Sequence, residues 1–462
     1  MRLRRHEIHQ RINGNLKIEF AKQAVSSHSG LELFKRYFRI INLNSRIRSA
    51  FQAHEFSGDY AVTDYILVFI ALWITGGRRL RHVAFLADDP LVKRLCGLSS
   101  IPCDRSISRW LGQFTNDSLQ ALVTLNSEIV EEKLKELDLA RITLDFDGTV
   151  LSCGNKVQWA FRGYNPHKRF AKSYYPLMCH IAQTGHFLTV KNRPGNIHDS
   201  TGALAVIRDS VDQVKKLLPG VVVEVRLDAA FFTNEIVGYL NRAKVEYVVK
   251  MPMWKWTGIK DDINATGYWH HSNDELSWAK KSVFLKKWNR EVEVICYRKK
   301  ISEKPGGTVG HQMNLFSPDD GIYEYFVLHT NKNIDPRNLS EFYNGRCAME
   351  HQLAEIKGEF GFDAVPTRHY QGNSAHQQIS VLAYNLVRNF QLDSGIAKKR
   401  PATAKRTNIF ELESLKTIRF ELVNAAGRIV NVAGTKILRL NQNFARKGRY
   451  EKIITGIERL AA

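Results

Sequence analysis

The chain has 462 residues, of which 44% are hydrophobic and 24% charged, and its formal net charge is +21. These values are typical of globular proteins and exclude wholesale disorder and fibrous repeats; the length suggests about three structural units. The longest apolar run, 65–75, has 11 residues, whereas a membrane span needs about 20, so no membrane partner is expected. The six cysteines are scattered, without the spacing of zinc ligands or of a disulfide framework, which favours a reducing cytoplasm.

The positive charge is concentrated at the two ends of the chain. Residues 1–50 contain 11 Lys and Arg against 3 Asp and Glu, a net +8, and residues 396–462 contain 15 against 5, a net +10. The segment between them is nearly neutral. This pattern favours a polyanionic partner, and nucleic acid is the commonest one. Two solvated basic tails without a partner are the alternative.

The first part of the chain, 1–140, is predicted to be mostly helical. Apolar residues recur at helical spacing from 62 to 87, interrupted at Gly76-Gly77. Further along, a short helix, a turn containing Pro102 and the segment around Arg109 have the order of a helix-turn-helix DNA reader. Helical hairpins of this kind are common, so Arg109 is only a candidate DNA contact.

From residue 141 onward, strand patterns alternate with helical patterns. Strands are predicted over 142–151, 173–182, 186–191, 221–228 and 245–251, and helices over 200–217 and 234–243. This order indicates an α/β sheet with mixed strand pairing. The segment 253–330 has further strand-like runs and is predicted to be a β-rich insert. Helices return at 336–360 and 374–391, and the basic stretch 398–406 is predicted to be a linker.

Acidic residues stand at the ends of two predicted strands. Asp145 and Asp147 project from the same face of the first strand, because side chains alternate along a strand. Asp228 ends the strand 221–228 in the same way. A carboxylate at the end of an apolar strand is costly unless it is paired or binds a metal, so these residues suit half of a divalent-metal site. The alternative is that each one caps a helix or forms a turn.

The helix predicted over 336–360 has an unusual polar stripe. At about 100° per residue, the side chains of Tyr343, Arg346, Glu350 and Lys357 lie within about 60° of each other. A phenol, a guanidinium, a carboxylate and an ammonium do not form a core face. These four groups could form an exposed ladder of salt bridges. Alternatively, the carboxylate could be one metal ligand and the other groups could contact DNA phosphates.

The motifs together resemble those of DDE transposases of bacterial insertion sequences that carry a Y-R-E-K signature. The matching residues are Tyr343, Arg346, Glu350 and Lys357, together with the strand ends Asp147-Gly148-Thr149 and 226–231. The stretches 163–166, 173–177 and 193–196 are similar to the insertion-sequence family numbered thirteen-eighty. The resemblance extends over nearly the whole chain and is strongest from 141 to 391.

The resemblance implies an α/β fold, in which a ribonuclease-H-like catalytic core carries a β-rich insert. A mostly helical DNA-binding region would precede the core, and a basic helical region would follow it. The regions expected are 1–140 for binding the DNA ends, 141–252 for the first part of the core, 253–335 for the insert, 336–395 for the second part of the core with the Glu helix, and 396–462 for DNA binding or dimerisation.

The resemblance also implies a mechanism. Asp147, Asp228 and Glu350 would hold two Mg²⁺ ions, with Mn²⁺ able to substitute, and the metals would support water-driven cleavage of the terminal inverted repeats and strand transfer by the freed 3′-hydroxyl. Tyr343, Arg346 and Lys357 would grip the DNA near the cut. The expected partners are double-stranded DNA of the transposon ends and target, and a second copy in a synaptic homodimer. The expected location is the bacterial cytoplasm, in association with the nucleoid.

Some members of the wider group stack a flipped base on a Trp in the last insert strand. The corresponding strand here, 323–330, has no Trp, so Tyr325 or Phe326 is the candidate, because base stacking tolerates different aromatic rings. Trp254 and Trp256 are weaker candidates, for which a core or surface role is favoured.

Three alternatives remain at this point. The strand with Asp145 and Asp147 also resembles the first motif of haloacid-dehalogenase-type phosphatases, with Asp145 as nucleophile, although no second acid follows Asp228 four residues later. A DNA-binding regulator or decayed transposase without catalysis would use the same basic ends. A stand-alone ribonuclease-H-like nuclease would cut without joining strands. Under the transposase interpretation, Asp145 has two possible roles. It either supports Asp147, or it is itself the catalytic residue in place of Asp147.

Overall fold

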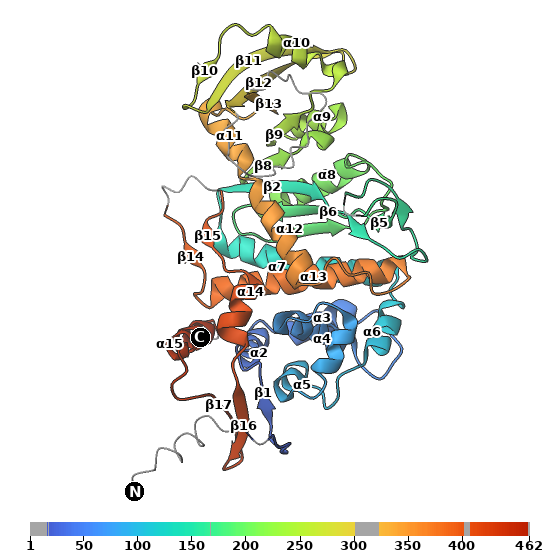
Figure 1. Cartoon of the computed structure of the whole chain (residues 1–462), viewed down its shortest axis with the longest axis vertical. Coiled ribbons are helices and arrows are strands. Elements are labelled where there is room, and N and C mark those ends of the chain that lie inside the picture. Colours follow the sequence, from blue (N-terminus) through green and yellow to red (C-terminus); the bar gives the residue numbers. More distant parts are fainter. Residues whose placement is uncertain (1–15, 17, 167, 301–322, 402–406, 461–462) are drawn as a thin grey trace.

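The computed structural model describes residues 16–460 except 17, 167, 301–322 and 402–406. The basic stretch 1–15 and half of the predicted linker therefore lie outside the described residues. Along the longest axis of the molecule, the N-terminal helices and the C-terminal elements lie at one end, the core in the middle and the insert strands at the other end (Figure 1). None of the helices in these ranges is long and apolar enough to cross a membrane.

The N-terminal region is helical, as the sequence predicts. Its helices are α2 (Leu31–Ile40), α3 (Leu43–Phe51), α4 (Val62–Thr75), α5 (Pro90–Cys96), α6 (Asp104–Leu111) and α7 (Asn116–Leu137), with a 3-10 turn at Leu80–Phe85. Helix α4 contains the longest apolar run and is buried throughout from Tyr65 to Ile74. The residue that follows its last turn is Gly76, with a φ of 103°, a backbone conformation that glycine adopts without strain. The run is thus a central core helix.

The middle of the molecule is a nine-stranded sheet in the order β10-β11-β12-β13-β9-β8-β2-β6-β7. Five of these strands come from the first predicted core segment: β2 (Arg141–Gly148), β6 (Leu177–Ile181), β7 (Phe187–Lys191), β8 (Val222–Leu227) and β9 (Glu246–Met251). Strands β2, β6 and β7 pair antiparallel, and β2, β8 and β9 pair parallel. This confirms the predicted mixed pairing. A small separate sheet contains β3 (Leu151–Ser152), β5 (Lys172–Tyr174) and β4 (Phe161–Arg162).

The strands of the insert extend the core sheet. They are β10 (His270–His271), β11 (Leu276–Leu285), β12 (Arg290–Lys300) and β13 (Tyr323–Thr330), and the segment also holds the short helix α10 (Ile259–Asn264). Strand β13 pairs antiparallel with β9, with Val327 opposite Met251. The insert thereby covers the backbone of β9, which would otherwise be an exposed sheet edge.

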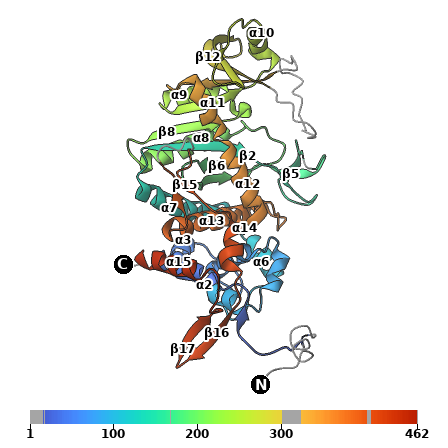
Figure 2. The same ribbon diagram turned by 60° about the vertical axis from the view of Figure 1, so that its left-hand side comes forward.

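The two faces of the central strands differ in polarity. On β2, Ile142, Leu144 and Phe146 face the hydrophobic cluster formed with α8 (Ala203–Leu217) and α9 (Asn234–Arg242). The alternate residues, among them Asp145 and Asp147, point to the other face. Helices α11 (Pro336–Asn344) and α12 (Cys347–Glu359) lie on this polar side and cross the sheet (Figures 1 and 2).

The helix predicted over 336–360 is interrupted. Helix α11 ends at Asn344 and α12 begins at Cys347, so Gly345 and Arg346 lie between them. The prediction of one continuous helix is wrong at this point. Glycine weakens a helix interior, and here a Cβ on residue 345 would lie 2.5 Å from Arg226 Nη1. Beyond α12, the long helix α13 (Tyr370–Asp393) is buried between the sheet and the N-terminal helices.

The C-terminal region is only partly helical, contrary to the expectation. It contains β14 (Lys398–Lys399), β15 (Phe410–Glu411), α14 (Leu415–Ile418), a π turn at Arg419–Val423, the hairpin β16 (Gly427–Val432) and β17 (Thr435–Arg439), and α15 (Lys447–Arg459). Strand β16 also pairs with β1 (Val25–Ser26) from the start of the chain. Leu415, Ile418 and Ile453 are buried in the core cluster of the N-terminal helices, so this region is packed against the body of the protein.

Candidate active site

Asp147 and Asp228 converge at the polar edge of the sheet, as predicted. Strands β2 and β8 are parallel neighbours, with Asp145 opposite Arg226, and each strand ends beside one of the two acids. The Oδ1 atom of Asp147 accepts from the Gly148 N–H at 2.9 Å, and the Oδ1 atom of Asp228 accepts from the Ala230 N–H at 3.0 Å. Asp228 therefore does cap a 3-10 turn, the alternative that the sequence left open. In both residues the other oxygen, Oδ2, makes a separate contact, with Arg346.

The guanidinium of Arg346 lies between these two Oδ2 atoms. Its Nη2 atom is 3.1 Å from Asp147 Oδ2 and 3.8 Å from Asp228 Oδ2. The side chains of Arg346 and Asp147 are 12% and 19% exposed, so their contact is largely shielded from water, which strengthens it, whereas Asp228 is 32% exposed. The structure thus brings one member of the predicted polar stripe into direct contact with the two strand-end acids.

Burial gives the two carboxyl groups unusual electrostatics. Burial raises the pKa of Asp147 to about 7, with Arg346 acting in the opposite direction and Asp228 and Asp199 adding to the rise. Burial also raises the pKa of Asp228, again opposed by Arg346 and reinforced by Asp199. Such shifts arise where like charges share a poorly solvated space, and they are typical of functional sites. A bound divalent cation would relieve this repulsion, so the pair fits a metal ion.

Asp199 is an acidic neighbour that the sequence reasoning missed. It lies in the loop after β7, where Arg193 Nη1 donates to its backbone oxygen at 3.0 Å. A Cβ on Gly148 would lie 2.7 Å from Asp199 Oδ1 and 2.6 Å from the Tyr175 ring, so a glycine is needed beside Asp147. The stretch 193–196 was part of the resemblance, and Asp199 follows it by three residues.

The remaining residues of the stripe occupy different environments. Burial raises the pKa of Tyr343, and Asp228 and Asp147 contribute to that rise. Burial lowers the pKa of Lys357, while Asp363 and Asp147 oppose the change. Tyr343 is therefore close enough to be influenced by both acids, and Lys357 by Asp147.

Glu350 is exposed in the first turn of α12. Within the described ranges, no three His, Cys, Asp or Glu side chains are arranged to hold a metal ion. Glu350 therefore stays a prediction as the third ligand.

Asp145 has a structural partner inside the sheet. Its two oxygens accept from Arg226 Nε at 2.6 Å and Nη2 at 2.7 Å, and both side chains are fully buried. Burial by itself raises the pKa of Asp145, but Arg226 and His180 outweigh it and hold the pKa below its ordinary value. Arg226 Nη1 also donates to the Phe342 backbone oxygen at 2.7 Å. The geometry leaves Asp145 no accessible oxygen for attack on a phosphoester, as the phosphatase alternative requires.

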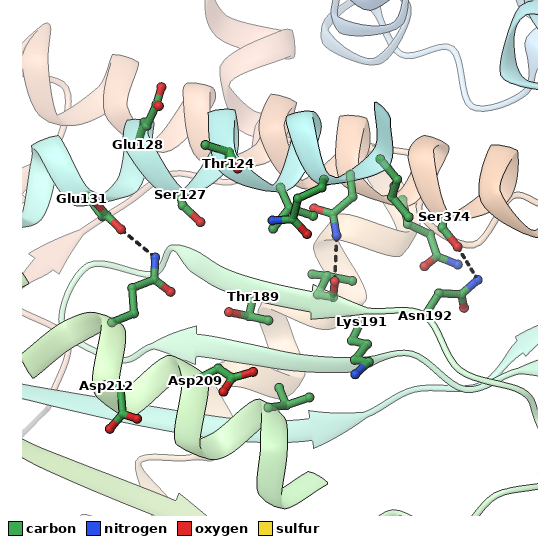
Figure 3. A pocket seen from close by; sticks show the side chains of 18 of the residues that line it. Thr124, Ser127, Glu128, Glu131, Thr189, Lys191, Asn192, Asp209, Asp212 and Ser374 are labelled. Atoms are coloured by element: carbon green, nitrogen blue, oxygen red, sulfur yellow. Dashed lines mark hydrogen bonds between the residues drawn. The ribbon is translucent and has the colours of Figure 1, made fainter. Parts of the chain in front are cut away.

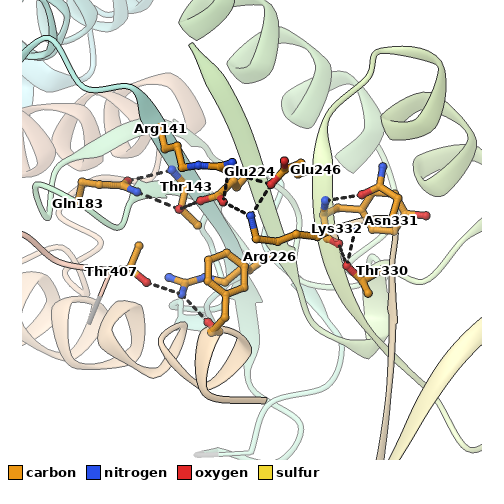
Figure 4. A network of polar contacts seen from close by, with 12 residues as sticks. Arg141, Thr143, Gln183, Glu224, Arg226, Glu246, Thr330, Asn331, Lys332 and Thr407 are labelled. Atoms are coloured by element: carbon orange, nitrogen blue, oxygen red, sulfur yellow. Dashed lines mark hydrogen bonds and ion pairs between the residues drawn. The ribbon is translucent and has the colours of Figure 1, made fainter. Parts of the chain in front are cut away.

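The polar face of the sheet continues away from the acidic pair (Figure 4). Thr143 Oγ1 donates to Glu224 at 2.6 Å, and Arg141 donates to the same carboxylate at 2.8 Å. Lys332 also pairs with Glu224 and with Glu246. These charges are mutually compensated, so this part of the face is a structural network that joins β2, β8 and β9.

The other predicted DNA contacts lie apart from the acidic pair or inside packed structure. Arg109 is exposed on α6, whose Trp110 stacks on Tyr65 in the core at 4.6 Å. Phe326 stacks on Tyr297 at 4.8 Å, and Tyr325 packs against Trp269 at 6.0 Å. Tyr325 and Phe326 are both half-buried.

A cavity of about 350 Å³ is lined by aromatic, cationic and polar groups. Some of these residues are close in sequence to Asp199 and Asp228. The lining residues are His198, Ser200, Ala230, Phe232, Thr233, Asn234, Trp254, Trp256, Lys287 and Trp288. Lys287 Nζ lies 5.0 Å from the centre of the Trp256 ring. A larger cavity of about 1070 Å³ lies over β7 between α7, α8 and α13, and no predicted site residue lines it (Figure 3).

The pKa of Asp147 predicts a pH-dependent stability in the absence of metal. Because its folded pKa of about 7 exceeds the ordinary value of about 3.9, the folded protein holds this proton more tightly. The resulting stabilisation is complete below about pH 4 and is lost as the pH rises through about 7. The melting temperature of Asp147→Asn relative to wild type, measured in EDTA, should therefore increase from pH 5 to pH 8. A difference that does not change with pH would contradict the assigned shift.

Comparison with known proteins gives the family. The model of the family described as transposase DDE domain group 1 matches residues 9–462, so the chain belongs to this family of transposases. No curated protein matches the chain. Among solved structures, a chain of the cryo-EM structure of the piggyBac transposase synaptic complex with hairpin DNA is 12% identical, with 94% of this chain and 85% of that chain covered and a TM-score of 0.41. The family membership confirms the transposase class predicted from the sequence.

Proposed function

We propose that this chain is the transposase of a bacterial insertion sequence with the Y-R-E-K signature, similar to the family numbered thirteen-eighty. It binds the terminal inverted repeats of its own element as a synaptic dimer, cuts the DNA and joins the freed ends to target DNA. The convergence of Asp147 and Asp228 at the ends of two parallel strands, with Arg346 between them, supports this proposal. The strand order β7-β6-β2-β8-β9 is consistent with a ribonuclease-H-like core.

In this proposal Asp147, Asp228 and Glu350 hold two Mg²⁺ ions. When bound, the metals would activate the attacking water or 3′-hydroxyl and stabilise the leaving oxygen. The protein's own groups orient the DNA: Arg346 and Lys357 contribute positive charge beside the acids, and Tyr343 contributes a hydroxyl. For an unpaired base, Trp254 is an exposed ring at the cavity, whereas Tyr325 and Phe326 are half-buried.

The test is a cleavage and joining assay on the DNA that flanks the chain's own gene, with Mg²⁺ or Mn²⁺. Nicks at inverted-repeat ends, followed by joining of those ends to a second duplex, are the expected result. Cleavage without joining would instead identify a nuclease. Tight binding without cleavage would identify a regulator or a decayed transposase. Phosphatase activity on a small phosphoester would revive the Asp145 alternative.

The basic C-terminal region is proposed to bind DNA through its exposed hairpin. Arg428, Lys436 and Arg439 are exposed on β16 and β17, and none of the three forms an ion pair with another described residue. Replacing all three by Gln should weaken DNA binding and reduce its salt dependence, by up to about 0.9 in the log–log slope for each phosphate that the variant no longer neutralises. Binding isotherms at several salt concentrations measure this.

The matched control for the hairpin variant removes three exposed cations from the opposite side of the core. Lys216 lies on α8, Arg242 at the end of α9 and Lys244 just after α9, and all three are exposed. Their replacement by Gln changes the net charge by the same amount and should leave the salt slope unchanged. Equal effects of the two triple variants would show that the hairpin makes no specific contribution.

A further inference from the structure

Arg346 stands where a cation between the two acids would stand. Its Nη2 atom approaches the Oδ2 atoms of Asp147 and Asp228 at 3.1 and 3.8 Å, while the Oδ1 atoms are hydrogen-bonded to neighbouring backbone N–H groups. The Nε atom of Arg346 is buried without a hydrogen-bond partner among the described residues. The guanidinium is therefore held mainly by the charge of the two carboxylates.

A divalent metal and this guanidinium need the same oxygens. Mg²⁺ binds carboxylate oxygens at about 2.0–2.1 Å and demands nearly ideal octahedral geometry. A guanidinium in hydrogen-bonding contact with those oxygens occupies the approach to them, and its positive charge repels the metal in a site of low dielectric. The metal ion can therefore bind both Oδ2 atoms only after the side chain of Arg346 has moved away.

The backbone around Arg346 allows such a movement without disturbing the sheet. Arg346 occupies the gap between α11 and α12, directly after Gly345. The end of α11 is anchored separately, through the bond from Arg226 to the Phe342 backbone oxygen. The side chain can thus leave the carboxylates while the strands and the end of α11 keep their positions.

We propose that Arg346 is an internal counter-ion that holds the acidic pair in the free protein and exchanges places with the metal when DNA binds. This inference rests on the proposed function. A DNA phosphate attracts the guanidinium, because Arg pairs with phosphate through charge-assisted hydrogen bonds. Its departure frees both carboxylates for the metal. Metal binding and DNA binding are then cooperative, and by linkage each strengthens the other by the same factor.

The test measures Mn²⁺ binding to the full chain by the electron paramagnetic resonance signal of free Mn²⁺, without DNA. Arg346→Gln should bind Mn²⁺ more tightly than wild type, by roughly 5- to 150-fold, the usual range of coupling between two ligands. Arg337→Gln is the matched control, since it removes one positive charge from an exposed position on α11 where Arg337 pairs with Asp335. The control should leave the Mn²⁺ affinity unchanged.

A second measurement adds duplex DNA, with the Mn²⁺ bound by DNA alone subtracted. DNA should raise the Mn²⁺ affinity of wild type and have a smaller effect on Arg346→Gln. Equal Mn²⁺ affinity of wild type and Arg346→Gln, both folded by circular dichroism, would overturn the counter-ion role. If Arg346→Gln does not fold, Arg346→Lys replaces it: the shorter side chain should give a smaller gain, and no gain would overturn the proposal.

The failure of the proposed function would look different. Asp147→Asn should remove the Mn²⁺ site in either background. If wild type and Arg346→Gln both bind no Mn²⁺ with or without DNA, the metal site itself is absent and both proposals fail. If Mn²⁺ binds and depends on Asp147 but is insensitive to Arg346, the metal site stands and only the exchange fails.

Discussion

Replacing Asp147 by Asn is expected to abolish Mg²⁺-dependent cleavage at the DNA ends while leaving the DNA binding measured without metal intact. Asp147 and Asp228 are the two acids that the sheet brings together, and both direct an oxygen to the position now held by Arg346. A metal that stabilises charge in the transition state contributes several kcal/mol, so its loss should slow cleavage about a thousand-fold or more. Single-turnover cleavage and an electrophoretic binding assay measure the two effects separately.

Two further variants decide which acid completes the site. Glu350→Gln should cause the same loss as Asp147→Asn, because the resemblance gives Glu350 the third ligand position. Asp199→Asn is the comparison, since Asp199 lies close enough to influence the pKa of both Asp147 and Asp228. Cleavage at the wild-type rate by Glu350→Gln, together with loss in Asp199→Asn, would reassign the third ligand to Asp199.

Breaking the buried pair of Asp145 and Arg226 is expected to destabilise the fold strongly. Both side chains are 0% exposed and joined by two hydrogen bonds. Removing one partner leaves an uncompensated buried charge, which costs about 3–5 kcal/mol. Asp145→Ala should therefore lower the denaturant concentration at which the core unfolds, measured by circular dichroism, whereas Glu451→Ala, at the exposed pair with Lys447, should cause no measurable shift.

A double variant separates stability from positioning. Asp145→Leu with Arg226→Met replaces the ion pair by apolar groups, and such replacements often recover stability. The bond from Arg226 to the Phe342 backbone oxygen is absent from this variant, so the segment before Arg346 loses its anchor. We expect recovered stability with impaired cleavage. Wild-type cleavage by a stable double variant would show that the pair only supports the fold.

Local patterns predicted most secondary structure because they depend on neighbouring residues. The alternation in β2 correctly placed Asp145 and Asp147 on one polar face, and the helix over 200–217 appears as α8 at Ala203–Leu217. The continuous helix through Arg346 was wrong, because its periodicity does not reveal the approach of Arg226 to Gly345. The hairpin in the C-terminal region was missed as well; its strand β16 pairs with β1 from the opposite end of the chain.

The amino-acid sequence by itself determined the transposase class and the position of the strand-end acids, since ordered motifs carry that information. Only the tertiary structure decided how these groups meet. It paired Asp145 with Arg226, brought Asp199 close to the acids and set Arg346 between Asp147 and Asp228. The physical reason is that such contacts join residues up to about two hundred positions apart, and they depend on strand register and helix packing, which no local pattern encodes.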